Sequence, residues 1–425
     1  MLSFYIALTI FILVVLLLML RRKGKLLVPM WAVFIVGSII AIAFGLVTPI
    51  QAIYSIDPQV MVFLFAMFTI SKGLEISGDL EAFSNWLIKK ANSSYQLSFF
   101  LSVGLGLASS IIMNDSLVIM GTPILLSYSK KMGTNPLPLL YTMAFSVTLG
   151  SAMTPMGNPQ NMLIATESGL KAPLIQFILY LLPFSLISLL FLSLYMRREI
   201  KISFSKNSVA KSFEIKRDEE LSKISRLSLV VAIGLMLFSD ALQLAGISSF
   251  LTLSEASLIG ALTLLILSKR RIEVLIKTEW RILVMFAGLF IFTKGLYSAG
   301  LISAIYPFFS FISRGNLAML IISSSIILSQ VLSNVPLTAL LLPLFKSIIP
   351  AGSSNVQYWT LFAASSTLAG ALTLLGAASN LIIADVAERN GVKFSYFDFA
   401  KRGIPLTIIC TLMLLVIFYI ESGLF

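Results

Sequence analysis

The sequence predicts an all-α protein that crosses a lipid bilayer many times. Of its 425 residues, 58% are hydrophobic and only 12% are charged, which is about half the charged fraction of an ordinary soluble domain. The apolar residues come in long unbroken runs and do not alternate with polar ones, which excludes a closed β-barrel. Because a spanning helix needs about 20 apolar residues, the chain has room for roughly ten to twelve spans.

The composition also excludes several classes of chemistry. The chain has no histidine, and Cys410 is its only cysteine. This excludes a zinc site, a haem, a serine or cysteine protease triad, an imidazole proton relay and a disulfide within the chain. We therefore expect no enzymatic activity and no cofactor. The net charge of +12 comes mainly from residues in the loops between spans, so the expected partner is the bilayer and not nucleic acid.

The predicted spans follow one another along the whole chain. The first, from Leu2 to Leu20, has its basic residues after the apolar run, so we expect a permanent helix and not a cleaved signal peptide. Nine further spans are predicted at residues 28–50, 59–76, 136–166, 172–196, 226–246, 252–268, 281–300, 357–387 and 403–421.

The basic residues predict the orientation. If the N-terminus lies outside, 26 of the 31 lysines and arginines fall in loops on the cytoplasmic side, as the positive-inside rule requires. The longest of these loops, residues 197–225, is predicted to be a charged cytoplasmic linker between a first repeat, 1–196, and a second, 226–425. We expect a multi-pass protein of the cytoplasmic membrane.

The two halves of the chain resemble each other. The segment 71–78, which begins Ser-Lys-Gly-Leu, matches the segment 293–300, which begins Thr-Lys-Gly-Leu. Further matches at spacings of 219 to 220 residues are Asn114 with Asn334, Pro123 with Pro343, and 157–161 with 376–380. Each half contains five spans and one further apolar stretch. Because five is odd, the second repeat is expected to be inverted in the membrane, an architecture that recurs in secondary transporters.

The two further apolar stretches, residues 96–130 and 316–349, are predicted to be re-entrant hairpins. After the polar residues in the middle of the first stretch, about 14 helical residues return the chain to its own side; they rise about 21 Å, less than the roughly 30 Å of hydrocarbon. Two full spans with an exposed turn are the alternative, and charge bias does not decide between the two. The predicted tips are Asn114 and Asp115 in the first hairpin and Ser333 and Asn334 in the second.

A helix that breaks inside the membrane is predicted after each hairpin. Two prolines and two glycines between Gly150 and Pro159 rule out a continuous helix over 136–166, and we predict a matching break in 357–387. Unwound backbone is tolerated there only if it is buried in protein or lines a cavity, where its carbonyl groups bind a cation and helix N-termini bind an anion. The asparagines at both hairpin tips carry a carbonyl and an amide, which suits a shared site. The alternative is a pair of packing kinks with satisfied asparagines.

Charged residues inside the spans are few. Asp115 at a hairpin tip indicates a cation or proton site. The alternative is that its carboxylate is bonded to backbone amides and orients the tip. Lys72 and Lys294 lie inside equivalent spans, and we expect their long stems to reach an interface; the alternative is a counter-ion for a substrate. Three carboxylates near span ends are expected to face headgroups or water: Glu75, Asp240 and Glu255.

These paired motifs resemble the ion transporter superfamily, which includes arsenite permeases, citrate-type carriers, divalent anion/sodium symporters and one class of sodium/proton antiporters. The resemblance covers nearly the whole chain and implies an elevator-type carrier, often a homodimer, that couples its substrate to Na⁺ or H⁺. It also implies one sodium site at Asn114, Gly157 and Asn158 and a second at Asn334 and Gly376. The other implied binding residues are Asp115, Thr154, Asn161, Ser333, Ser379 and Asn380.

The hairpin tips depart from those of the carboxylate symporters, which read Ser-Asn-Thr. Here they read Met-Asn-Asp and Ser-Asn-Val, so both threonines that would bond a carboxylate are absent, which favours the arsenite-permease and antiporter branches. The leading hypothesis is a secondary transporter of a small anion, an inorganic oxyanion such as arsenite or a carboxylate, coupled to H⁺ or Na⁺, with Asp115 as the proton carrier. The alternative is a Na⁺/H⁺ antiporter without an anion substrate.

Overall fold

The computed structural model describes residues 2–21, 29–200, 217–247, 251–313, 316–350 and 355–424, and all regular structure in these ranges is helical. The helices of the first half are α1 (Leu2–Arg21), α2 (Met30–Ala43), α3 (Pro49–Ser55), α4 (Pro58–Ile76), α5 (Asp79–Lys90), α6 (Ser94–Phe99), α7 (Leu105–Ser109), α8 (Asn114–Met132), α9 (Leu137–Ser151), α10 (Pro159–Glu167) and α11 (Pro173–Met196). Those of the second half are α12 (Glu219–Leu244), α13 (Leu253–Leu267), α14 (Arg271–Lys277), α15 (Trp280–Ser298), α16 (Leu301–Ser313), α17 (Leu317–Leu332), α18 (Asn334–Ile348), α19 (Asn355–Leu368), α20 (Ala378–Arg389) and α21 (Tyr396–Leu424). A π-helical segment, Phe100–Gly104, joins α6 to α7, and a 3₁₀ turn, Ala369–Ala371, follows α19.

The all-α membrane fold predicted from the sequence is confirmed. Each predicted span contains a helix, and the two helices predicted to break do so, between α9 and α10 and between α19 and α20. Within the described chain, α4, α11, α12, α15 and α21 are long and apolar enough to cross a membrane on their own.

Several features differ from the prediction. The returning limb of the first hairpin is α8, which has 19 residues and not about 14, and it rises roughly 28 Å. The predicted span 28–50 is divided into α2 and α3, because the chain turns at Gly45, which adopts a left-handed conformation (φ 75°). The predicted linker, 197–225, ends earlier than expected, because Asp218 caps α12, which begins at Glu219 and not at residue 226. Residues 201–216 of that linker lie outside the described residues.

Six long helices form one packed group, here named the six-helix group: α1, α2, α4, α12, α13 and α15. Within it α15 packs along α2, and α4 packs along α13. The close approach of α15 to α2 depends on Gly288, where a Cβ would lie 3.1 Å from the backbone of Phe34. Ser38 donates a hydrogen bond of 2.6 Å to the Gly288 carbonyl oxygen. Small residues and buried polar contacts of this kind hold membrane helices together where lipid supplies no hydrophobic drive.

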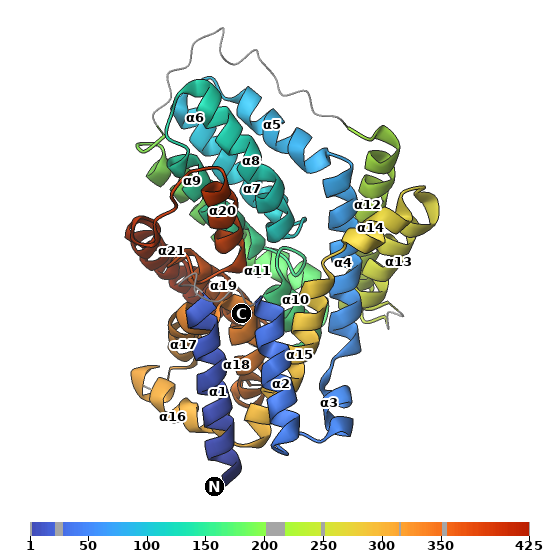
Figure 1. Ribbon diagram of the computed structural model, residues 1–425, viewed down its shortest axis with the longest axis vertical. Helices are drawn as coiled ribbons and strands as arrows, with labels where there is room; N and C mark the ends of the chain where they lie inside the picture. Colours follow the sequence, from blue (N-terminus) through green and yellow to red (C-terminus); the bar gives the residue numbers. More distant parts are fainter. Residues whose placement is uncertain are drawn as a thin grey trace.

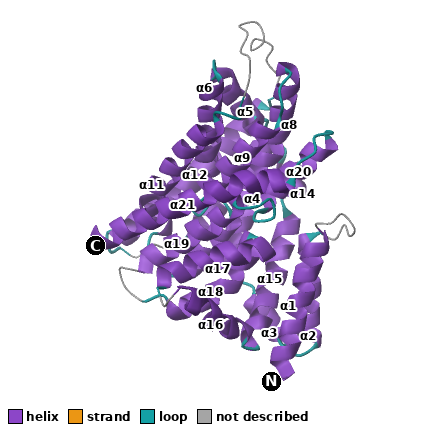
Figure 2. Ribbon diagram, turned by 90° about the vertical axis from the view of Figure 1, so that its left-hand side faces the viewer, coloured by secondary structure: helices purple, strands orange, loops and turns teal. Residues whose placement is uncertain are grey.

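The two predicted hairpins enter the molecule from opposite ends. Figure 1 shows α6, α7 and α8 of the first hairpin in its upper part and α17 and α18 of the second in its lower part, and Figure 2 shows α6 and α8 separated from α17 and α18 in the same way after a quarter turn. The returning limb of each hairpin packs against the broken helix of the other half, α8 against α20 and α18 against α10. This exchange brings the hairpin tips and the helix breaks together inside the protein.

A charged cluster fastens α5 to α12 at the end of the molecule that carries the first hairpin. The buried Asp79 carboxylate accepts hydrogen bonds from Arg217 at 2.5 Å, from Arg226 at 2.8 Å and from the Ser222 hydroxyl at 3.0 Å. Gly78, with φ 81°, lets the chain turn directly from α4 into α5. Because α5 leads into the first hairpin, this cluster fixes the point at which that hairpin leaves the six-helix group.

Asp218 makes a second contact at this end. Its carboxylate accepts hydrogen bonds from the Leu221 N–H at 3.0 Å and from the Arg270 guanidinium at 2.8 Å. These contacts, first the backbone N–H and then the arginine, hold the pKa of Asp218 below its usual range. Their stabilisation is therefore present above the ordinary pKa of an aspartate and is lost as the pH falls through the lowered value.

Asp79→Ala is expected to lower the stability of the purified protein by about 1–3 kcal/mol, because it removes hydrogen bonds to two arginines and a hydroxyl. Thermal unfolding in detergent, read as the apparent Tm, measures the loss. Asp398→Ala is the matched control, because Asp398 is an exposed aspartate in the first turn of α21 with no ion pair among the described residues. Equal Tm values for the two variants would contradict the role assigned to Asp79.

Candidate functional site

The tip of the first hairpin is bonded to the break in the first broken helix. The Asn114 N–H donates a hydrogen bond of 3.1 Å to the Gly157 carbonyl oxygen. Asn114 is only 7% exposed, and its side-chain oxygen Oδ1 has no hydrogen-bond partner in the described part of the chain. A buried polar atom without a partner is costly, so this oxygen is a candidate ligand for a bound ion or molecule.

The tip of the second hairpin repeats the backbone contact. The Asn334 N–H donates a hydrogen bond of 3.2 Å to the Gly376 carbonyl oxygen. The side-chain nitrogen of Asn334 donates to the carbonyl oxygens of Ser366, at 3.0 Å, and Gly376, at 2.7 Å. Ser333 holds a left-handed conformation (φ 71°), which is strained for a residue with a side chain, and its hydroxyl donates to the Gly376 carbonyl at 3.3 Å. With its amide group oriented so that the nitrogen faces these carbonyl groups, Asn334 is bonded to protein through that nitrogen, and Asn114 keeps a side-chain oxygen without a partner among the described residues.

Gly157 and Gly376 permit these contacts because a side chain at either position would collide with backbone. A Cβ on Gly157 would lie 2.4 Å from the Ser151 carbonyl oxygen, and a Cβ on Gly376 would lie 2.6 Å from the Ala369 carbonyl oxygen. Each break therefore folds back closely on the helix that precedes it.

Asn161 and Asn380 bond the carbonyl groups that the two breaks leave free. The side-chain amide of Asn161 donates to three backbone carbonyl oxygens and that of Asn380 to two, and two acceptors of each are related by the same spacing of 219 residues as the donors. The matched bonds are Asn161 to Ser151 (3.1 Å) and Thr154 (3.2 Å), and Asn380 to Gly370 (2.8 Å) and Thr373 (3.4 Å). These two side chains brace the unwound backbone, as matched positions of a duplicated sequence would.

Asn158 begins α10 and connects the two halves. Its Oδ1 accepts a hydrogen bond of 2.9 Å from the Asn161 N–H, which caps the helix. Its amide nitrogen donates to the Ser151 carbonyl oxygen at 3.0 Å and to the Thr367 hydroxyl of α19 at 3.3 Å. Asn158 is fully buried by these contacts.

Thr154 and Ser379 complete the predicted set. The Thr154 hydroxyl donates to the Ser110 carbonyl oxygen of the first hairpin. Ser379 is buried near the start of α20, and its hydroxyl has no hydrogen-bond partner within the described ranges.

A cavity of about 560 Å³, here named the tip cavity, lies where the hairpin tips meet the broken helices. The four helices that follow a hairpin tip or a helix break begin at its wall: α8 at Asn114, α10 at Pro159, α18 at Asn334 and α20 at Ala378. The first turn of a helix has free N–H groups and a partial positive charge, so the four ends together favour a negatively charged ligand. The predicted site residues that line this cavity are Asn114, Asp115, Ser333 and Asn334.

The wall of the tip cavity carries charges of both signs. Asp115 lines it from the first turn of α8, and its carboxylate has no ion pair among the described residues. Arg281 lines it from α15, and Asp385 and Arg389 of α20 form an ion pair of 2.9 Å beside it. The wall therefore offers carboxylates to a small cation and guanidinium groups to a small anion.

Lys72 does not reach an interface, so that prediction was wrong. Lys72 is buried, and its Nζ lies 2.8 Å from the Glu75 carboxylate and 2.8 Å from the Glu279 carboxylate. Glu279 lines the tip cavity at the start of α15. Lys72 therefore neutralises two carboxylates, one of which borders the cavity.

The expected exposure was also wrong for two carboxylates. Glu75 is bonded to Lys72 with its side chain 13% exposed. Asp240 is 1% exposed and accepts a hydrogen bond of 2.9 Å from the Ile175 N–H at the start of α11. Glu255 is exposed, as expected.

Glu279 is a cavity residue that the sequence analysis did not single out. A signal was present, because Asp57 and Glu279 each precede one of the matched lysines by 15 residues. Each of these acids stands immediately before the equivalent helices α4 and α15.

Interrupted helices whose N-termini meet at a polar cavity inside an all-helical membrane fold define the class of secondary transporters. The sequence profile of the citrate transporter family matches residues 14–364 of this chain, and the chain belongs to that family. The protein is therefore a multi-pass membrane transporter and not an enzyme.

Individual relatives agree with this assignment. The 46 kDa membrane protein of Mycobacterium leprae is 25% identical over 419 residues, which cover 95% of each chain. The silicon efflux transporter LSI3 of Oryza sativa subsp. japonica is 26% identical over 447 residues, which cover 89% of this chain and 90% of LSI3. Among solved structures, the YdaH transporter of Alcanivorax borkumensis matches with a TM-score of 0.56 over 88% of this chain and 87% of that chain. At 14% identity, this likeness shows the fold alone.

Gly157→Ala is expected to destabilise the protein by about 1–3 kcal/mol, because the added Cβ overlaps backbone that has no room to move. Gly234→Ala in α12 is the matched control, because no atom lies within 4 Å of a Cβ at that position. The apparent Tm in detergent should fall for the first variant and stay level or rise for the second, since alanine favours a helix more than glycine does. A Gly157→Ala protein as stable as the parent would show that the close approach is not required.

Lys72→Met is expected to lower stability by about 3–5 kcal/mol, because it leaves two carboxylates without their cation. Adding Glu75→Gln and Glu279→Gln to Lys72→Met should recover most of the apparent Tm. Lys401→Met is the control, since Lys401 is exposed and has no ion pair in the described part of the chain. If Lys72→Met and Lys401→Met unfolded at the same temperature, the buried network would carry no stability.

Proposed function

We propose that this protein is a secondary active transporter that moves a small anion, an inorganic oxyanion or a carboxylate, coupled to Na⁺ or H⁺. The observation that carries the proposal is the meeting of four helix N-termini at the tip cavity. Each end contributes roughly half a positive elementary charge, and the first-turn N–H groups that the protein does not bond are donors for a ligand. An anion of a few heavy atoms receives more donors there than any single side chain supplies.

The coupling cation is proposed to bind beside the anion. The unpartnered Oδ1 of Asn114 is a ligand suited to Na⁺, and the Asp115 carboxylate in the same wall supplies the charge. Asp115 is also the proposed proton carrier if the coupling ion is H⁺. The sodium site at Asn114, Gly157 and Asn158 is better supported than the site at Asn334 and Gly376, because the Gly376 carbonyl already accepts several hydrogen bonds.

Sidedness and movement are parts of the same proposal. With the N-terminus outside, we place the tip cavity on the cytoplasmic side, because Arg281 at the start of α15 and Arg389 at the end of α20 line it and belong to the basic residues assigned to that side. We propose that residues 1–196 and 226–425 are inverted repeats, with re-entrant hairpins at 96–130 and 316–349. The hairpins and broken helices would move as an elevator against the six-helix group, in a homodimer.

The class of anion is drawn from the family and the site together. The family is described as citrate transporters, and one relative is named for silicon efflux. The cavity binds through helix ends, which recognise negative charge and not a particular carbon skeleton. Carboxylates and inorganic oxyanions are therefore both to be tested.

Vesicles that contain the purified protein are expected to accumulate one of citrate, arsenite, arsenate or silicate when a Na⁺ or pH gradient is imposed. Asn334→Ala and Asp115→Asn should each reduce the rate at least about tenfold, the effect of losing roughly 1.4 kcal/mol of binding. Asp398→Asn, the exposed control in α21, should stay within about twofold of the parent. Parent-level transport by both cavity variants, at equal incorporation, would contradict the site.

The antiporter alternative gives a different result in the same vesicles. Sodium-driven proton movement without any added anion, lost in Asp115→Asn, would support it and reject the anion substrate.

A further inference from the structure

A second cavity lies at the other end of the helices that wall the tip cavity. This cavity of about 660 Å³, here named the distal cavity, is bordered by α3, α10, α15 and α18. Its polar lining includes Gln51, Glu167, Thr293, Lys294, Lys346 and Ser347. None of these residues belongs to the tip cavity.

Three helices border both cavities. α10, α15 and α18 each line the tip cavity with their first residues and the distal cavity with later ones. On α15, Arg281 lines the tip cavity and Lys294 lines the distal cavity; the thirteen-residue separation corresponds to about 20 Å along the helix. The two cavities therefore approach each other along the same helices from opposite ends.

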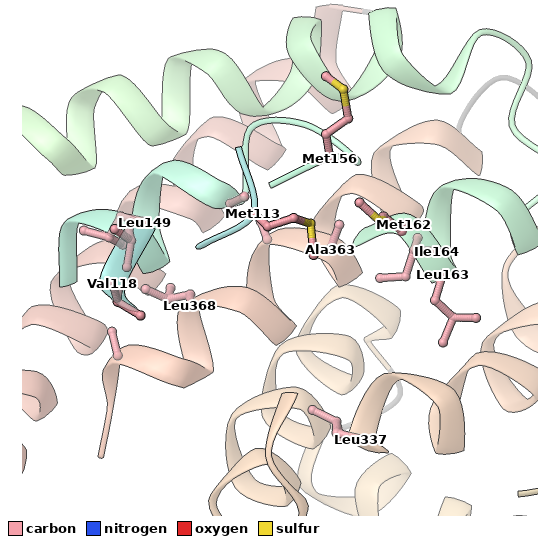
Figure 3. Close-up of a cluster of buried hydrophobic side chains, with 14 of the residues drawn as sticks. Met113, Val118, Leu149, Met156, Met162, Leu163, Ile164, Leu337, Ala363 and Leu368 are labelled. Carbon is pink, nitrogen blue, oxygen red and sulfur yellow. The ribbon is translucent and has the colours of Figure 1, made fainter. Parts of the chain in front are cut away.

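Buried side chains fill the turn between the two linings of each helix, here named the partition. The apolar ones are Met162 in α10, Phe286 and Leu289 in α15, and Leu337 in α18, and the polar ones include Asn161 and Thr338. Figure 3 shows Met162 and Leu337 within the cluster of buried hydrophobic side chains. An ion does not cross the partition without a change of structure, because the apolar side chains do not replace its hydration and the Asn161 and Thr338 side chains already donate to backbone carbonyl groups.

Two polar groups of the distal cavity have no partner among the residues that the structure describes. Thr293 is 6% exposed, and its hydroxyl has no hydrogen-bond partner in the described part of the chain. Lys294, the next residue, is exposed to the cavity and forms no ion pair with any described residue. An unused hydroxyl donor and an unused ammonium group thus stand side by side.

Comparison of the two halves shows that this lysine is exceptional. Its counterpart Lys72 is neutralised by Glu75 and Glu279. The spacing that matches Lys72 with Lys294 also matches Glu75 with Tyr297, which has no carboxylate, and Glu279 with Asp57.

The carboxylates near the distal cavity are engaged elsewhere. Asp57 accepts a hydrogen bond of 2.9 Å from the Val60 N–H, which caps α4. Glu167 is bonded to Lys346, the other lysine of the cavity. Lys294 remains the cation available to a ligand.

We propose that the distal cavity is a second anion-binding site, with Thr293 and Lys294 as its ligands and a small oxyanion or carboxylate as its occupant. The proposal rests on the transport function above, because it places this site on the far side of the partition along the same route. The C-terminal ends of α10 and α18 lie near this cavity, and their partial negative charges repel an anion. Anion binding there therefore requires the positive charge of Lys294. The distal site therefore binds more weakly than the tip cavity, which suits a site of entry and release.

Charge-selective thiol labelling tests the distal site without requiring transport. Cys410 is the only native cysteine and is buried, so Cys410→Ala with Ser347→Cys leaves one thiol, at the wall of the distal cavity. The rates of reaction with the anionic sulfonatoethyl and the cationic trimethylammonioethyl methanethiosulfonates are measured in lipid vesicles. Lys294→Gln should lower the ratio of the anionic to the cationic rate by about five- to tenfold, as loss of one nearby charge predicts. Lys401→Gln, an exposed lysine outside the cavity, should leave the ratio unchanged.

The hydroxyl is tested by protection. Millimolar citrate or inorganic phosphate should slow labelling of Ser347→Cys, and Thr293→Val, which keeps the shape of the side chain, should weaken this protection.

An unchanged rate ratio in Lys294→Gln would overturn the proposal, and so would the absence of protection by either anion. Lys294-dependent labelling in a protein that transports no anion would leave the distal site standing and reject the transport function. Anion transport without Lys294-dependent labelling would support the transport function and reject the distal site.

Discussion

Two helices stop and restart inside the protein, and the structure around them follows from the need to satisfy the backbone groups that these interruptions release. Asn161 and Asn380 bond the carbonyl groups of the unwound segments, and the N–H groups of Asn114 and Asn334 bond the carbonyl groups of Gly157 and Gly376. The restarted helices α10 and α20 begin at the wall of the tip cavity, so the positive ends of their dipoles lie there. Pairing the released carbonyl groups with protein while placing these helix ends at the cavity favours a negatively charged ligand.

Buried charge is distributed unequally between two otherwise similar halves. The lysine near the tip cavity, Lys72, is neutralised by two glutamates, so the helix ends and not a lysine attract an anion there. The lysine at the distal cavity, Lys294, has no such partners, and the helix ends near it have the opposite polarity. In the tip cavity the helix ends add positive potential to that of Arg281 and Arg389, whereas in the distal cavity the lysine without an ion pair among the described residues is Lys294.

The sequence predicted the first helix break because two prolines and two glycines are concentrated within ten residues there, whereas single prolines such as Pro123 and Pro183 are accommodated inside α8 and α11. The second break was predicted from its match to the first. The sequence could not predict that Lys72 pairs with Glu279, because the partner lies 207 residues away and no local pattern encodes the contact. The sequence also could not show which asparagines bind an ion and which bond the unwound backbone. An asparagine beside a helix break looks the same in the sequence in both roles. Asp240 was placed wrongly for a related reason, since the helix start that it bonds belongs to α11.

If the anion and the coupling cation share the tip cavity, each must change the affinity of the other by the same factor. Equilibrium binding of the transported anion to the purified protein, measured by calorimetry over a range of Na⁺ concentration and pH, tests this directly. The shared site predicts that anion affinity rises with the concentration of either Na⁺ or H⁺, and that cation affinity rises equally when the anion is present. An anion affinity that is independent of both cations would contradict it.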